Sequence, residues 1–171
     1  LNHSRIRMSD GEYCEAEKII TTIPWNSYQH ITGLPEDLYL AVKRLKHSSI
    51  ETRYVGDTLQ TDAQWLYIPD EQKPYHRILI RHNFCQGSRG YWLETRKERV
   101  DMYSDEAQFC YMNEYAYPLN TIDKPQIMQQ LLAFTSERQV YGLGRWGEHC
   151  HYNSDVVVDL AMKLSEKICH E

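Results

Sequence analysis

The chain has 171 residues and a formal net charge of −5, within the usual size of one domain. This acidic balance argues against a basic surface for nucleic acid, although it permits a local basic pocket for a phosphate-bearing small molecule. Five cysteines, an odd number without a CxxC pair, indicate a reduced, cytoplasmic chain. We find no signal peptide and no run of eighteen apolar residues, so no transmembrane segment is expected.

The N-terminal part predicts two strands and a helix. We expect strands at 5–8 and 17–23 around the turn Ser9-Asp10-Gly11, with the second strand ended by Pro24. Pro35, followed by two acidic residues, is typical of a helix start, because proline fits the first turn and acids favour the helix N-terminus. Apolar residues then recur at helical spacing.

The middle of the chain alternates with period two, which predicts an antiparallel sheet. Its four expected strands lie near 50–58, 63–68, 76–84 and 90–96. Residues 87–90, Gly-Ser-Arg-Gly, resemble a hairpin loop, and the charged stretch 98–107 favours a short helix. A further strand near 108–116 is expected to end at Tyr117-Pro118.

The C-terminal part predicts a helix, a strand and a second helix. Asp123 can cap a helix that has Pro125 in its first turn. A strand is expected at 139–143, and the last helix runs from near Asn153 towards Ile168. The buried face of that helix is predicted to consist of Val157, Leu160, Ala161, Leu164 and Ile168. These elements define an α+β class, with an antiparallel or mixed sheet and helices on it.

Trp65, Tyr67 and Arg77 form the first candidate site. Trp65 and Tyr67 share one strand face because side chains alternate. If the hairpin between Pro69 and Pro74 is symmetric about residue 72, Tyr67 lies directly opposite Arg77. An aromatic hydroxyl beside a guanidinium suits a diphosphate. An ordinary cross-strand pair that stabilises the sheet fits the same spacing.

The glycine-rich stretch 141–147, Tyr-Gly-Leu-Gly-Arg-Trp-Gly, is the second candidate. It joins an expected strand to the last helix, whose N-terminus presents unpaired N–H groups and a partial positive charge. Such an end can bind a phosphate or the electron-rich edge of a flavin. The stretch is not a GxGxxG motif, and without further context a plain strand–helix connection explains it.

The run His149-Cys150-His151 contains metal-ligand residue types. However, adjacent side chains point to opposite faces of an extended chain, and no second ligand pair lies at zinc-like spacing, so we expect no metal site. Gly-x-Ser-x-Gly, Walker and HExxH motifs do not occur, so hydrolase chemistry has no support.

Several segments, in order along the chain, resemble the UDP-galactopyranose mutase family of amine-oxidase-like flavoproteins. Residues 20–24, Ile-Thr-Thr-Ile-Pro, resemble the strand that enters the substrate domain of these proteins. Residues 144–148 and 153–155 resemble their closing flavin-binding segment. The remaining matches are the spacing of Trp65, Tyr67, Pro69 and Arg77, and the pair Tyr117-Pro118.

The resemblance implies roles for two sets of residues. The implied substrate-binding set is Trp65, Tyr67, Arg77, Tyr117 and His149, with Arg77 pairing with the diphosphate of a nucleotide sugar. The implied cofactor-binding set is Gly144, Arg145, Trp146, Asn153, Ser154 and Asp155. In the family, reduced FAD carries the conversion of UDP-galactopyranose to UDP-galactofuranose for surface polysaccharide and LPS biosynthesis, so no catalytic side chain is expected.

The sequence departs from the family in two ways. The family usually has Tyr or Trp where His149 stands, and an imidazole could replace the phenol as phosphate donor. No GxGxxG strand–helix unit occurs, whereas in the family that unit lies at the N-terminus and binds the ADP half of FAD. We therefore expect a C-terminal fragment whose partner is the missing N-terminal Rossmann part, and which does not retain FAD by itself.

The resemblance also implies a division of the chain. Residues 1–24 would lead into the substrate domain, 25–120 would form its antiparallel sheet, and 121–171 would contribute a helix–strand–helix unit to the FAD domain. The oligomeric state is not defined by the sequence. Two alternatives stay open: a fragment of another FAD-dependent amine-oxidase-like oxidoreductase, or a non-catalytic module that binds a nucleotide sugar or a partner protein.

Overall fold

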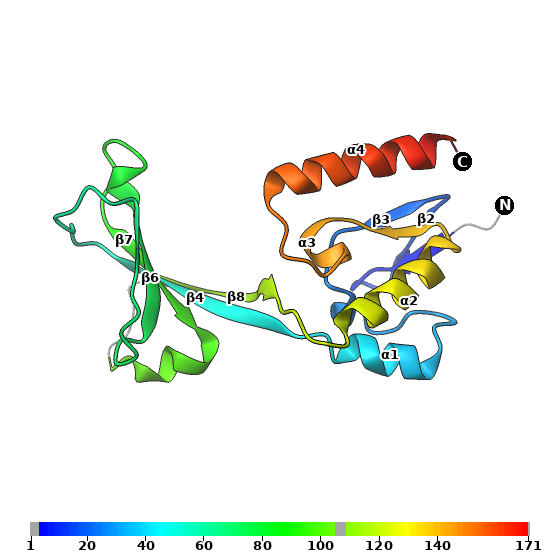
Figure 1. Cartoon of the computed structure of the whole chain (residues 1–171), viewed down its shortest axis with the longest axis horizontal. Coiled ribbons are helices and arrows are strands. Elements are labelled where there is room, and N and C mark those ends of the chain that lie inside the picture. Colours follow the sequence, from blue (N-terminus) through cyan, green and yellow to red (C-terminus); the bar gives the residue numbers. More distant parts are fainter. Residues whose placement is uncertain (1–3, 105–108, 171) are drawn as a thin grey trace. The chain divides into compact units, whose positions relative to one another are not determined.

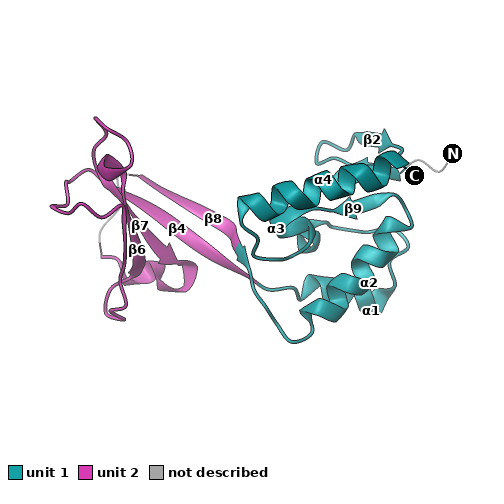
Figure 2. Cartoon of the chain, turned by 45° about the horizontal axis from the view of Figure 1, so that its top comes forward, with its two compact units in different colours: residues 1–46, 117–171 teal, residues 47–116 magenta. Residues whose placement is uncertain are grey.

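The computed structural model describes residues 4–104 and 109–170. The chain forms two compact units (Figure 2). The first unit comprises residues 1–46 and 117–171, and the second comprises residues 47–116. Within the described residues, no helix combines the length and the apolar character needed to cross a membrane. All five cysteines are free thiols.

The first unit begins with a β-hairpin. Strand β1 (Ser4–Arg7) pairs antiparallel with β2 (Tyr13–Ala16). The expected hairpin partner at 17–23 is therefore wrong. The chain reverses earlier because Gly11, at φ +90°, donates its N–H to the Met8 carbonyl and closes the turn at once.

The strand that follows pairs with a distant part of the sequence. Strand β3 (Ile19–Thr21) is parallel to β9 (Val140–Gly142), with Ile19 opposite Val140. Helices α2 and α4 lie on opposite sides of this two-stranded sheet (Figure 1). The first unit is thus a small layered α/β arrangement.

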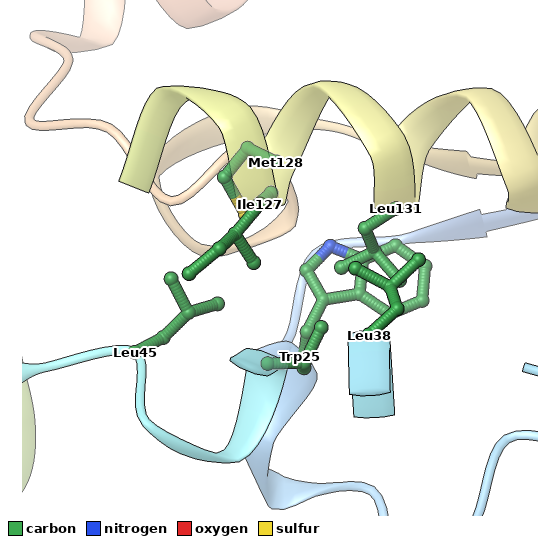
Figure 3. Close-up of a cluster of buried hydrophobic side chains, with 7 residues drawn as sticks. Trp25, Leu38, Leu45, Ile127, Met128 and Leu131 are labelled. Carbon is green, nitrogen blue, oxygen red and sulfur yellow. The ribbon is translucent and has the colours of Figure 1, made fainter. Parts of the chain in front are cut away.

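The core of the first unit is built from both of its sequence segments (Figure 3). The 3-10 helix η1 (Trp25–Ser27) and helix α1 (Glu36–Lys43) pack against helix α2 (Lys124–Ser136). Helix α1 begins after Pro35 as expected, whereas Asp123 makes no side-chain capping hydrogen bond to α2. The buried cluster consists of Trp25, Leu38, Val42, Leu45, Ile127, Met128 and Leu131.

Two further helices complete the first unit. The short helix α3 (Gly144–Gly147) follows β9, and helix α4 (Ser154–His170) closes the chain. The predicted apolar face of α4 is real but only half-buried, and none of the described α4 residues is fully buried. Its half-buried apolar residues are Val157, Leu160, Ala161, Leu164 and Ile168.

The second unit is a five-stranded sheet in the order β5-β6-β7-β4-β8. Its strands are β4 (His47–Val55), β5 (Trp65–Tyr67), β6 (Tyr75–Ile80), β7 (Tyr91–Arg96) and β8 (Phe109–Pro118). The pairs β5–β6, β6–β7 and β4–β7 are all antiparallel. The α+β class with a mainly antiparallel sheet is confirmed.

The connections of this sheet differ in detail from the expectation. Between β6 and β7 the chain makes the 3-10 turn η2 (Arg81–Asn83) before the glycine loop, so the connection is longer than the predicted loop at 87–90. The charged stretch after β7 forms η3 (Lys97–Met102), a 3-10 helix; residues 105–107 of the predicted helix lie outside the described residues. The apolar cluster Ile78, Ile80 and Leu93 marks the core face of the sheet.

The boundaries of the compact units differ from the division expected on functional grounds. Residues 25–46 pack with the C-terminal helices, because the Trp25 indole N–H donates to the Gly147 carbonyl at 2.7 Å and α1 shares a core with α2. The sheet alone, residues 47–116, forms the other unit. Which functions belong to 25–120 and 121–171 stays a prediction.

Candidate functional site

The predicted register of Tyr67 and Arg77 is confirmed. Tyr67 is the antiparallel partner of Arg77, and Trp65 is the partner of Leu79. Trp65 and Tyr67 are 49% and 67% exposed. Because Ile78 belongs to the core face, its neighbour Arg77 and the cross-strand partner Tyr67 lie on the opposite, outer face of the sheet.

A β-bulge at His76 decides which face Arg77 occupies. Tyr75 is the partner of Thr95, whereas Arg77 is the partner of Glu94, so β6 carries one extra residue at this point. Tyr75 packs against the core cluster. In a regular strand residues two apart share a face, so without the bulge Arg77 would follow Tyr75 to the core side.

Arg77 forms an ion pair with Glu94. Its Nη2 and Nε atoms lie 2.6 and 2.9 Å from one carboxylate oxygen of Glu94. The side chain of Glu94 is nearly buried and that of Arg77 is 24% exposed. Sequence reasoning missed Glu94, although its position two residues after Trp92 in an alternating strand places it on the outer face. We call Trp65, Tyr67, Arg77 and Glu94 the sheet group.

The glycine-rich stretch of the first unit has a packing reason. A Cβ atom on Gly142 would come within 2.2 Å of the Gly147 carbonyl oxygen, and a Cβ on Gly147 within 2.4 Å of the Thr21 carbonyl oxygen. Gly144 has a φ of +75°, which favours glycine. Its N–H donates to the Glu148 carboxylate at 3.2 Å, and burial raises the pKa of Glu148. Glycine at these positions allows the backbone at Thr21, Gly142 and Gly147 to pack closely together.

Three side chains meet beside this turn. The Arg145 guanidinium carbon lies 5.3 Å from the centroid of the Tyr117 ring, and the ring of His151 meets the same ring edge-on at 4.8 Å. Arg145 also donates to the Tyr152 carbonyl at 3.0 Å, which fixes its orientation. Burial is the main reason that the pKa of Tyr152 rises to about 12. We call Tyr117, Arg145 and His151 the turn group.

His149 and His151 have different environments. The His149 side chain is 1% exposed, and its Nε2 lies 3.0 Å from the Lys46 carbonyl oxygen. The His149 backbone has a φ of 48°, an uncommon value for a non-glycine residue. His151 is exposed and contacts Tyr117. His151 is thus the imidazole that a ligand could reach, and sequence reasoning had considered it only as a metal ligand.

The predicted cofactor residues are partly accessible. Asn153, Ser154 and Asp155 are exposed at the N-terminus of α4, and Arg145 is half-buried. Trp146 is half-buried and meets the His149 ring edge-on at 5.9 Å. An exposed helix N-terminus beside a guanidinium fits the electron-rich edge of a flavin ring. Among the described residues, no three or more His, Cys, Asp and Glu side chains converge as metal ligands.

The structure therefore brings part of the predicted set together in two groups, while Gly144, Trp146, His149 and residues 153–155 belong to neither. The sheet group belongs to the second unit, and the turn group belongs to the first. A shallow hollow between α1 and α2, lined among others by Asp37, Arg44 and Asp123, contains none of the predicted site residues. Each group has the chemistry of an anion site: a guanidinium beside aromatic side chains that carry hydrogen-bonding groups.

Comparisons with known proteins identify the fold. No protein-family model and no curated protein matches the sequence. Among solved structures, a reduced UDP-galactopyranose mutase matches over 84% of this chain, with a TM-score of 0.64 and 20% sequence identity. The chain spans 38% of the length of that protein. The chain thus has a mutase-like fold.

Proposed function

We propose that this chain is the substrate-binding part of a flavin-dependent mutase that interconverts UDP-galactopyranose and UDP-galactofuranose. The observation that carries the proposal is the likeness in fold to a UDP-galactopyranose mutase over 84% of the chain. The product would supply galactofuranose for surface polysaccharide. The sheet group and the turn group provide the protein side of this chemistry.

The sheet group is proposed to bind the nucleotide sugar. Arg77 would pair with the diphosphate, and the exposed hydroxyl of Tyr67 would donate to the same phosphates. Trp65 stacks on Phe84 but stays exposed, so its ring offers further surface on which a base or sugar can stack. Glu94 holds the Arg77 guanidinium at the outer face of the sheet.

The turn group and the start of α4 are proposed to hold the flavin. Arg145 and the N-terminus of α4 at Asn153 would face the flavin ring. When bound, reduced FAD would supply the nucleophilic chemistry at the anomeric carbon. Tyr117 and His151 would donate hydrogen bonds to phosphate, and we leave the buried His149 out of the ligand set.

FAD binding is proposed to require a dinucleotide-binding domain in addition to this chain. The sequence has no GxGxxG unit, and the chain spans 38% of the length of the similar mutase. Two features of the first unit agree with an added partner: among the described residues both strands of the β3–β9 sheet have an unpaired edge, and the apolar face of α4 is only half-buried. We expect the chain alone to be colourless; flavin absorbance at 450 nm would contradict this part of the proposal.

Nucleotide binding can be tested on the chain itself. Titration with UDP, followed by calorimetry, should give binding that Arg77→Ala weakens roughly tenfold or more, because a charged hydrogen-bond partner is lost. Arg81→Ala is the matched control, since Arg81 is exposed just beyond the end of the same strand. Equal effects of the two variants would remove Arg77 from the proposed site.

Catalysis is tested with the chain supplied with its proposed dinucleotide-binding domain, reduced FAD and UDP-galactofuranose. Formation of UDP-galactopyranose is expected. A flavin-loaded, reduced protein that binds UDP but forms no product would exclude the mutase and favour the alternative of a nucleotide-sugar binding module.

A further inference from the structure

A second arginine lies on the same sheet face as Arg77. Arg96 ends β7, two residues after Glu94, so the side chains of Glu94 and Arg96 share the outer face. Glu94 is the partner of Arg77, and Arg96 follows Glu94 by two residues on β7, so both arginines lie on one face, on either side of the bulge at His76. Long arginine side chains in this arrangement can reach one ligand.

The charge balance of this face depends on Arg96. The positive charge of Arg77 is matched by the carboxylate of Glu94, and the pair is mostly buried. Arg96 is exposed, and within the part of the chain that the structure describes no carboxylate lies at ion-pair distance from it. Arg77 and Glu94 together present little net charge, so the net positive charge on this part of the face comes from Arg96.

The pKa of His76, the residue at the bulge, is affected by the charges of the same arginines. Burial is the main reason that the pKa of His76 is lowered; Glu94 opposes the shift, and Arg77, Arg96 and Arg99 add to it. Three guanidinium groups are therefore close enough to His76 to disfavour a further positive charge. An anion bound among them would have the opposite effect.

We propose that Arg96 is a second phosphate-binding residue, which acts with Arg77 on the diphosphate of the nucleotide sugar. The inference rests on the proposed function and deepens it, because it locates the net positive charge of the site within this chain. Arg77 supplies an oriented guanidinium, fixed by Glu94, and Arg96 supplies the uncompensated charge. Two guanidinium groups suit a ligand with two linked phosphates better than one with a single phosphate.

The test compares two substitutions that change the net charge equally. UDP and inorganic pyrophosphate are titrated into the chain and into its Arg96→Gln and Lys97→Gln variants. Lys97 is the next residue, is exposed, and begins η3 rather than continuing the strand. Arg96→Gln should weaken both ligands roughly tenfold or more, and Lys97→Gln less than about twofold. Equal losses would mean that only net charge matters and would overturn the proposal.

A second measurement reports the position of the bound anion. In an NMR titration, pyrophosphate should raise the pKa of His76 in the unaltered chain, because a nearby negative charge favours the imidazolium. The ligand-induced rise should be lost in Arg96→Gln. If saturating pyrophosphate still raises the pKa of His76 in Arg96→Gln, the anion binds beside His76 without Arg96, and the proposal is overturned.

The failure of this inference can be told apart from the failure of the proposed function. If UDP binds and depends on Arg77 but not on Arg96, the inference is wrong and the function stands. If UDP fails to bind while pyrophosphate binds in an Arg96-dependent way, the inference stands and the nucleotide-sugar function is wrong. If neither ligand binds, both are wrong. Circular dichroism of each variant verifies that it is folded.

Discussion

Arg77 and Glu94 face each other on neighbouring strands, and the Nε and Nη2 atoms of the arginine both donate to one oxygen of the carboxylate, at 2.9 and 2.6 Å. Glu94 is 7% exposed, so this carboxylate depends on the guanidinium for its charge compensation. The pair therefore has two separable effects: it stabilises the sheet, and it cancels charge on the outer face.

Glu94→Gln should separate these effects. Removal of the carboxylate costs the charged hydrogen bonds, so the free energy of unfolding should fall by about 1.5–3 kcal/mol. The affinity for UDP should rise a few-fold, because the positive charge released at Arg77 should outweigh the loss of the contact that orients its guanidinium. Chemical denaturation and calorimetric titration measure the two quantities, with the exposed Glu98→Gln as control. If stability and affinity fall together, Glu94 acts mainly by positioning Arg77.

Gly90→Ala tests the packing of the outer face. A Cβ on Gly90 would lie 2.4 Å from the Tyr54 hydroxyl oxygen and 2.5 Å from the nearest atom of its ring, and the centroids of the Tyr54 and Trp92 rings are 5.1 Å apart. Gly87 has nearly the same φ, +80° against +79°, but a Cβ there meets nothing within 4 Å.

Both alanine variants bear the cost of a positive φ, so their difference isolates the contact with Tyr54. We expect Gly90→Ala to lower stability by about 1–3 kcal/mol more than Gly87→Ala, and to reduce the near-ultraviolet circular dichroism of the aromatic pair. Equal loss of stability in the two variants would show that the Tyr54 ring moves aside at little cost.

Trp25→Phe tests the contact that joins the two sequence segments of the first unit. The indole N–H donates to the Gly147 carbonyl oxygen, and Trp25 is buried. Phenylalanine leaves that carbonyl without this donor, so we expect a loss of about 1–3 kcal/mol in the first unit. Hydrogen exchange of the Ile19 amide, which donates to the Gln139 carbonyl, measures this loss locally. Trp65→Phe, at an exposed position of the other unit, should leave this exchange unchanged.

Glu148 should make the first unit less stable as the pH rises. Burial raises the pKa of Glu148 in the folded chain, and the Gly144 N–H only partly opposes this. The folded state therefore holds the proton more tightly than the unfolded state. The resulting stabilisation is fully present below the unfolded pKa and is lost as the pH rises through the folded pKa.

The measurement is the free energy of unfolding from pH 4 to pH 7. Glu148→Gln should lose less stability over this range than the unaltered chain, because glutamine does not ionise. The exposed Glu17→Gln, in the same unit, should keep the original slope. An unchanged slope in Glu148→Gln would show that the Gly144 hydrogen bond cancels the effect of burial on the pKa of Glu148.

Local patterns predicted much of the fold. Alternation located the antiparallel strands, and the symmetric hairpin placed Tyr67 opposite Arg77. The apolar spacing of α4 identified the correct residues of its inner face. These features depend on residues that are close together in the sequence. The alternation of side chains in a strand and their repeat every 3.6 residues in a helix are enough to predict them.

Other features depend on long-range contacts or on single backbone angles. No local pattern pairs Ile19 with Val140, 121 positions away along the chain, so the partner of β3 was not predictable. The positive φ of His149 is part of the turn that buries its side chain and leaves His151 beside Tyr117. A bulge at His76 has no sequence signature, although it determines the face of Arg77.

The parallel pairing of β3 with β9 also constrains the order of folding. On the ribosome the whole sheet unit, residues 47–116, emerges before Val140 exists to receive Ile19. The N-terminal segment stays unpaired, with Ile19 and Trp25 uncovered, while the sheet folds from antiparallel contacts that lie closer in sequence. During synthesis the N-terminal 46 residues are therefore the part of this chain that most needs protection by a chaperone.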